Sequence, residues 1–225
     1  MSFVFDNRPS DSPFVEFMWR TQTEGSSPSF MSQATYHWEM VVTRQQGNIS
    51  VVMRGPETKA SPAPVPHEAD IFGIVFKLGT FMPHLPLPHL VDAPALLPLA
   101  CFKSFWLHGA TWELPDFDNA DTFVQRLERE NMLLHDPLVS AALQGQIKDV
   151  SLRSVQRRFV HATGLSQGSI YQIDRARHAR TLLQQGISIL DTVEQAGYAD
   201  QPHLTRSLKR FMGQTPAQIL RSIQR

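Results

Sequence analysis

The chain has 225 residues, enough for two small domains or for one larger domain with a buried core. Its hydrophobic content of 42% and charged content of 19% exclude a wholly disordered chain, and no window offers the run of about eighteen apolar residues that a membrane span needs. The single cysteine, Cys101, excludes an internal disulfide and a multi-cysteine zinc site, and the first residues lack a secretory pattern, so we expect a cytoplasmic protein.

Charge divides the chain into two unlike parts. Residues 1–150 hold 10 Lys and Arg against 17 Asp and Glu, a balance of −7, whereas residues 151–225 hold 11 against 4, a balance of +7. A compact module with such a surplus has the positive surface potential of a polyanion binder. A solvated basic face, or a basic module docked on the acidic part, would give the same numbers. Charge alone therefore favours a nucleic-acid partner only modestly.

The first part of the chain has the pattern of a small β-rich domain, which we place at residues 1–115. Fourteen of the sixteen prolines precede residue 150 and are densest in 55–66 and 83–98, which we expect to be loops. Between these runs, three strands are predicted, at residues 38–44, 49–54 and 71–77. The first two flank Gln45–Asn48, a predicted hairpin turn in which Gly47 or Asn48 takes a positive φ.

Residues 116–135 are predicted to connect the two domains. Phe123, Leu127, Asn131 and Leu134 recur at helical spacing, so a helix is expected over 119–134. It could pack on the β-rich domain or serve as a dimerisation helix, and the pattern does not choose between them.

An internal repeat follows at an offset of 49 residues, which indicates a duplicated supersecondary unit. Each copy supplies a helix N-cap, an arginine between two apolar residues, a helix-ending glycine and a second cap. The pairs are Ser151 and Asp200, Val155 and Leu204, Arg157 and Arg206, Phe159 and Leu208, Gly164 and Gly213, Ser166 and Thr215, and Ile170 and Ile219.

The second copy has the pattern of a helix-turn-helix motif. A short helix over 189–196, with Leu190 and Val193 facing inward, is followed by a turn at Gly197. Asp200 is predicted to cap a second helix that ends near residue 212. Leu204, Leu208 and Phe211 would form the buried stripe of that helix.

The first copy is predicted to be less complete. Its second helix, 152–163, buries Val155 and Phe159, and an amphipathic helix over 169–185 would separate the two copies as a rigid spacer. The supporting helix, 137–144, is short and is followed by the polar run QIKDV. We therefore expect a shortened or irregular first motif.

At these residues the sequence resembles the DNA-binding domain of the AraC/XylS family of bacterial transcription regulators. The resemblance covers roughly residues 138–222 and is carried by QRRFVHATGLSQGSIYQIDRARHARTLLQQG and ILDTVEQAGYADQPHLTRSLKRFMGQTPAQI. It implies an α+β protein, in which a β-rich, cupin-like N-terminal domain precedes an all-α double helix-turn-helix domain at 136–225. It also implies a regulator rather than an enzyme, with no cofactor. The implied partners are double-stranded DNA, RNA polymerase, a small-molecule effector and a second copy of the chain.

The resemblance also implies a set of DNA-contacting side chains on the second helix of each copy. Those facing the major groove would be Arg153, Gln156, Arg157, Gln201, Pro202, His203, Thr205 and Arg206. Arg158 and Lys209 would contact phosphates.

Two other functions remain open for the N-terminal domain. It could be a metal-dependent, cupin-like enzyme, because His37, Glu39, His67, Glu68, His84, His89 and His108 include the ligand types that metals prefer. The His-x-His pattern of metal-binding cupins is missing, however, and we expect no metal site. Alternatively, the domain could be a protein-interaction module. Its aromatic residues could line an apolar pocket, although most are expected in the core.

Overall fold

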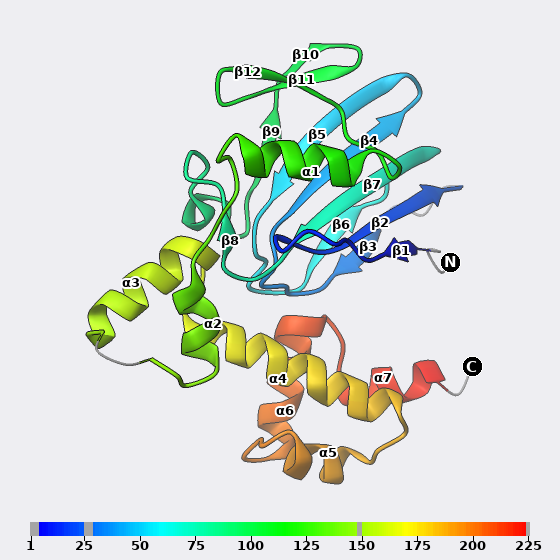
Figure 1. Cartoon of the computed structure of the whole chain (residues 1–225). Helices are drawn as coiled ribbons and strands as arrows, with labels where there is room; N and C mark the ends of the chain where they lie inside the picture. The colour runs from blue at the N-terminus through cyan, green and yellow to red at the C-terminus, as the bar shows by residue number, and fades with distance from the viewer. Residues whose placement is uncertain (1–4, 25–28, 148–149, 224–225) are drawn as a thin grey trace. The chain divides into compact units, whose positions relative to one another are not determined.

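The computed structural model describes the chain except residues 1–4, 25–28, 148–149 and 224–225. It divides into two compact units (Figure 1). Unit 1 comprises residues 1–28, 37–56 and 65–166, and unit 2 comprises residues 29–36, 57–64 and 167–225. These units are defined by contacts and do not follow the predicted boundaries at 115 and 136. The predicted boundaries separate a regulatory part from a DNA-binding part, which contacts alone do not test, so they stay a prediction.

Unit 1 is built on a six-stranded antiparallel sheet with the order β1-β2-β7-β4-β5-β9. The expected strands are β4 (Glu39–Gln45), β5 (Asn48–Arg54) and β7 (Ala69–Phe76). The other three, which the sequence pattern did not single out, are β1 (Asp6–Arg8), β2 (Val15–Thr23) and β9 (Pro94–Leu97).

The turn between β4 and β5 lies at Gln45–Asn48, where it was predicted. Gln46 and Gly47 have positive φ angles of 48° and 79°, whereas Asn48 already belongs to β5. A two-residue hairpin turn with both central residues left-handed matches the twist of the flanking strands. The prediction that Gly47 or Asn48 takes a positive φ is therefore confirmed by Gly47, and Gln46 takes one as well.

Helix α1 (Ala120–Arg129) lies across one face of this sheet (Figure 1). Its buried residues, among them Phe123 and Leu127, share one apolar core with the sheet. The helix is shorter than predicted, because Asn131 adopts a left-handed φ of 56° and the next two residues turn back into the core. Leu134 is exposed and belongs to β13 (Leu134–His135), which pairs with β8 (Thr80–Phe81).

Smaller elements complete the β-rich part of unit 1. A three-stranded sheet consists of β10 (Leu99–Cys101), β11 (Ser104–Leu107) and β12 (Ala110–Glu113), and the 3-10 helix η1 spans Leu87–His89. Within the described residues the main sheet is open at β1 and β9. A cupin-like closed barrel therefore stays a prediction, whereas the β-rich character is confirmed.

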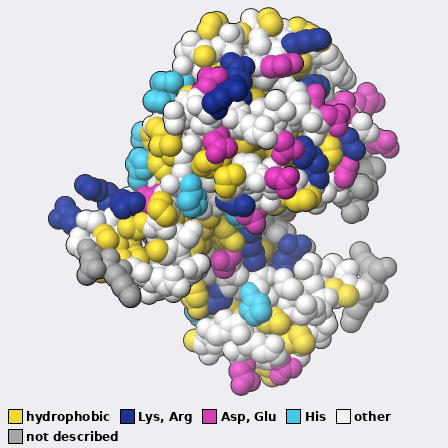
Figure 2. All heavy atoms as spheres, viewed as in Figure 1, with side chains coloured by type: hydrophobic (Ala, Val, Ile, Leu, Met, Phe, Trp, Pro, Cys, Tyr) yellow, Lys and Arg dark blue, Asp and Glu magenta, His cyan; other side chains and the backbone are white. Residues whose placement is uncertain are grey.

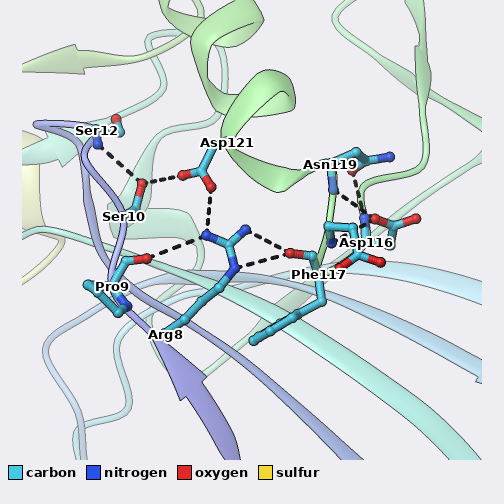
Figure 3. A network of polar contacts seen from close by, with 9 residues as sticks. Arg8, Pro9, Ser10, Ser12, Asp116, Phe117, Asn119 and Asp121 are labelled. Carbon is cyan, nitrogen blue, oxygen red and sulfur yellow. Dashed lines mark hydrogen bonds and ion pairs between the residues drawn. The ribbon is translucent and has the colours of Figure 1, made fainter.

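A polar network joins β1 to the start of α1 (Figure 3). Arg8 donates two hydrogen bonds to the Phe117 carbonyl, at 2.7 and 3.1 Å, and its Nη1 lies 2.6 Å from Oδ2 of Asp121. Ser10 donates to the other oxygen of Asp121, also at 2.6 Å. Partial burial opposes ionisation of Asp121, but the bonds from Ser10 and Arg8 hold its pKa below the usual value.

Unit 1 also contains the helices of the first repeat copy, α2 (Pro137–Leu143) and α3 (Leu152–Thr163). The bounds of α3 are those predicted. The hydroxyl of Ser151 accepts the Ser154 amide, and Gly164 ends the helix with a φ of 77°. Both predicted caps are therefore confirmed.

Unit 2 is built around α4 (Gln167–Gln184), the predicted spacer helix. It packs against α5 (Ile189–Gln195), α6 (Gln201–Met212) and α7 (Pro216–Ile223). Its predicted apolar positions are all buried: Ile173, Ala176, Ala179 and Leu183.

Two segments from the first part of the chain also belong to unit 2. Strand β3 (Ser29–Ser32) pairs with β6 (Ser61–Pro64), and Thr35 and Glu57 exchange two backbone hydrogen bonds beyond the strand ends. We call residues 29–36 and 57–64 the ribbon. The second of these segments was predicted to be a loop, since proline is uncommon in strands, but both of its prolines lie in β6, which pairs only with β3 among the described strands.

Candidate nucleic-acid interface

The second repeat copy forms a compact helix-turn-helix motif from α5 and α6. Asp200 accepts the His203 amide at 2.6 Å, as expected of an N-cap, and Gly197 takes a left-handed φ of 67° in the turn. Leu204, Leu208 and Phe211 are buried as predicted.

The buried face of α5 differs from the prediction. Leu190 is 71% exposed and Val193 is only half-buried, whereas Thr192 and Ala196 are buried. Positions four apart share one face of a helix, and Leu190 lies two positions from Thr192, on another face. The assignment of Leu190 as an inward residue was therefore wrong.

Side-chain contacts hold both α6 and α4 to the turn before α6. The hydroxyls of Tyr198 and Ser207 lie 2.8 Å apart in a buried hydrogen bond. Arg175 of α4 donates to the Gly197 carbonyl at 3.4 Å, and its guanidinium stands 4.4 Å from the centre of the Tyr198 ring. Sequence reasoning missed all three side chains, because none lies on the exposed face of α6.

The outward face of α6 carries positive charge. Pro202, Arg206 and Lys209 share one side of the helix at three- and four-residue spacing and are exposed. Gln201 is exposed as well, whereas His203 and Thr205 at the margins are half-buried. The exposed side chains could meet phosphates and base edges, and the half-buried pair is more restricted.

The first motif has a supporting helix of normal length but a long connection. Helices α2 and α5 both span seven residues, so α2 is not shortened relative to its counterpart. The irregularity lies in the linker, residues 144–151 in place of 196–200, which adds three residues to the turn. Part of the polar run QIKDV, residues 148–149, lies outside the described residues.

Arg158 ties α3 to the start of α2. Its Nε and Nη2 meet the two oxygens of Asp136 at 2.9 and 2.5 Å, and Asp136 also accepts the Leu138 amide as the N-cap of α2. Partial burial alone would raise the pKa of Asp136, but the hydrogen bonds from Arg158 and from the Leu138 amide lower it overall. Ser207, 49 residues after Arg158, is likewise turned toward its own support, where its hydroxyl meets that of Tyr198 in the turn after α5. Position 158 therefore faces the support rather than straight outward.

The outward face of α3 is basic as well. Arg153, Gln156 and Arg157 are exposed and share one side of the helix. Figure 2 shows Lys and Arg side chains gathered over α3. Each unit thus presents a helix with an exposed arginine at equivalent repeat positions, Arg157 and Arg206.

Other binding chemistry finds less support in the described residues. Within them, no group of three or more His, Cys, Asp or Glu side chains is placed to hold a metal ion. The His84 and His108 rings stack face to face, with their centres 3.4 Å apart. His37 Nδ1 forms a hydrogen bond with the Phe76 carbonyl. None of the described helices is both long enough and apolar enough to cross a membrane.

Comparison with known proteins decides the type of the C-terminal motif. Residues 146–222 match a family model described as a helix-turn-helix domain. They form an AraC-type helix-turn-helix domain. The match begins after α2, so the supporting helix of the first motif lies outside it. The AraC-type domain thus includes both basic helices, α3 and α6.

Curated relatives resemble the chain over the same region. It is 32% identical over 96 residues to the HTH-type transcriptional regulator GlxA of Rhizobium meliloti, covering 42% of this chain and 29% of that protein. It is also 32% identical over 88 residues to the HTH-type transcriptional regulator RipA of Corynebacterium glutamicum, covering 38% and 27%. The chain therefore aligns with less than a third of the length of either regulator.

Solved structures of ToxT from Vibrio cholerae are similar over nearly the whole chain, at low identity. An apo variant covers 96% of this chain and 100% of its own, with a TM-score of 0.40 and 10% identity. A second crystal form covers 96% and 97%, with a TM-score of 0.39 and 11% identity.

Proposed function

We propose that this protein is a sequence-specific DNA-binding transcription regulator. The observation that carries the proposal is the AraC-type domain with an exposed basic face on α6, held by the Asp200 cap and the Tyr198–Ser207 hydrogen bond. A recognition helix needs this combination of a rigid support and outward side chains that can reach base edges.

The proposed DNA contacts follow the repeat. Arg206 and Arg157 would contact guanine edges, the glutamines Gln156 and Gln201 would contact adenine, and Lys209 would contact phosphate. The further proposed contacts are Arg153, Pro202, His203, Thr205 and Arg158. For Arg158, DNA contact would require release from Asp136, to which it is bound in the free protein.

We propose a bipartite binding site in which α3 and α6 enter successive major grooves, about 34 Å apart, on one face of the duplex. Residues 136–225 would provide the DNA-binding domain and residues 116–135 the connection to it. RNA polymerase would be the partner through which binding changes transcription.

The N-terminal β-rich part, residues 1–115, would sense a small-molecule effector or mediate association of two copies. Its large exposed apolar side chains favour association: Leu96 is 70% exposed on β9 and Phe102 is 71% exposed after β10, with Trp106 on β11 nearby in the sheet. Exposed apolar side chains that gather on one region are typical of interaction surfaces. Sedimentation velocity of the full chain and of Phe102→Ser tests this, and an unchanged sedimentation coefficient would count against that surface.

The experiment for DNA binding uses the full chain. Sequences bound from a random DNA pool are selected, and affinity for the preferred sequence is then titrated at about 50 and 200 mM salt. We expect the logarithm of affinity to fall linearly with the logarithm of salt concentration, by about 0.9 per phosphate contact. Affinity that does not depend on salt, or a pool without enrichment, would contradict the proposal.

A further inference from the structure

The ribbon contacts the end of the proposed recognition helix through its backbone. The Ala34 amide donates to the Phe211 carbonyl at 2.8 Å, and the Ala60 amide donates to the Arg210 carbonyl at 2.7 Å. The last four carbonyls of a helix have no partner within the helix itself. Two of these carbonyls in α6 thus accept amides from residues that lie 177 and 150 positions earlier in the chain, since 211 minus 34 is 177 and 210 minus 60 is 150.

The equivalent helix of the first motif ends differently. There the Gly164 amide donates to the Val160 carbonyl at 2.8 Å, so the chain that follows α3 caps its own helix. Helix α6 also ends on a left-handed glycine, Gly213, with a φ of 72°. It differs in receiving amides from outside the repeat.

Side chains fix the same ribbon to α4. Arg180 donates to Oε1 of Gln33 at 2.6 Å, and Arg177 donates to the Ala34 carbonyl at 3.3 Å. The Arg177 guanidinium also stands 5.0 Å from the centre of the Tyr36 ring. The ribbon therefore bridges α4 and the C-terminal end of α6. The angle between these two helices sets the direction in which the exposed face of α6 points.

Gly213, at the end of α6, packs against the Met31 side chain of the ribbon. A methyl group added there would lie 2.5 Å from Cγ and 2.9 Å from Sδ of Met31, and 3.3 Å from Cβ of Ala60. Atoms at these distances must move apart. The contact is thus close-packed as well as hydrogen-bonded.

We infer that the ribbon is a positioning element of the DNA-reading unit, so that this unit is discontinuous in sequence and comprises residues 29–36 and 57–64 besides the helices of the second motif. The inference rests on the proposed function, because it concerns the aim of α6 toward DNA. The ribbon holds the carbonyl end of α6 and also holds α4. It thus limits the orientations of α6 before DNA binds, so that binding itself has fewer orientations to restrict. Residues outside the helix-turn-helix sequence would then determine affinity for the preferred site.

The test compares two pairs of variants in the full chain. Gly213→Ala requires the Met31 side chain of the ribbon to shift, and Gly186→Ala is its control, because Gly186 also has a left-handed φ, of 84°, but faces open space. Gln33→Ala removes the acceptor for Arg180, and Gln33→Glu restores an acceptor oxygen at the same place. The measurements are amide hydrogen exchange of the ribbon and affinity for preferred and scrambled DNA.

We expect Gly213→Ala and Gln33→Ala to speed hydrogen exchange in residues 29–36 and 57–64 and to weaken binding to preferred DNA by about three- to tenfold. Binding to scrambled DNA should change little, and both control variants should behave like the original chain. Faster exchange of the ribbon without a change in binding to preferred DNA would overturn the inference, as would unchanged exchange in both variants. If the original chain itself preferred no DNA sequence, the proposed function would fail first, and this outcome is distinct from the other two.

Discussion

Asp136 provides the sharpest test of how the first motif is supported. The Asp136→Ala variant loses the N-cap of α2 and the paired hydrogen bonds to Arg158 at once. Loss of an aspartate cap costs about 0.5–2 kcal/mol. The ion pair adds about 0.2–1 kcal/mol, a value kept low because the Arg158 side chain is 47% exposed. The local stability of α2 and α3 should thus fall by about 0.7–3 kcal/mol.

Smaller changes separate the two contributions. Asp136→Asn keeps a good capping side chain and loses the charge, so it should cost about 0.5–1 kcal/mol. Arg158→Ala should cost no more than Asp136→Asn, and the double variant should show coupling between positions 136 and 158. Asp200→Ala is the matched control. It removes the N-cap of α6, and among the described salt bridges Asp200 has no arginine partner. Its cost should be independent of Arg158→Ala.

The assay is native-state hydrogen exchange of the full chain, followed in peptides from α2 and α3, because a chain of two units need not unfold in one step. The pKa of Asp136 is lowered by folding, so its contribution is complete above the ordinary aspartate pKa and disappears as the pH falls below about 4. Equal losses for Asp136→Ala and Asp136→Asn at neutral pH would refute the capping role. Absence of coupling to Arg158 would refute the ion pair.

Three further predictions can be checked with the same protein. Arg206→Ala should weaken binding to preferred DNA more than Arg157→Ala does, by up to about 1–3 kcal/mol, and filter binding that ranks them in the opposite order would contradict the unequal support of the two motifs. Tyr198→Phe or Ser207→Ala should each cost about 1–2 kcal/mol in thermal unfolding, while the double variant should cost less than their sum, because no buried hydroxyl is then left unpaired. Asp121→Asn should lower stability at pH 7, and the difference from the original chain should shrink as the pH falls below about 4, because the folded pKa of Asp121 is depressed; a constant difference across a pH series of melting curves would rule this out.

Local signals predicted the C-terminal helices well. The N-cap side chains Ser151 and Asp200 and the glycines at 164 and 213 mark the ends of α3 and α6, since caps and left-handed residues act on neighbouring backbone. The error at Leu190 arose because a seven-residue helix has too few apolar positions to define its buried face. The actual face includes Thr192, a polar residue that apolar periodicity overlooks.

Contacts between distant segments were beyond the reach of such signals. The ribbon has no periodicity of its own, and its hydrogen bonds to α6 come from backbone amides, which carry no sequence information. The pairing of Arg158 with Asp136 was missed for a related reason. An exposed arginine on a recognition helix has the same sequence pattern whether it faces solvent, phosphate or a neighbouring carboxylate.

The ribbon also has a consequence for the order in which the protein folds. Ala34 and Phe211, which share a hydrogen bond, are 177 positions apart in the sequence, since 211 minus 34 is 177. Contacts between such distant residues form slowly, because the entropy of closing the intervening loop is lost before the contact forms. Synthesis adds about 5–20 residues per second. The acceptor carbonyls in α6 are therefore made about ten seconds or more after the ribbon amides that donate to them. Helix α6, which is made after the ribbon, thus completes contacts whose amide donors are already synthesised.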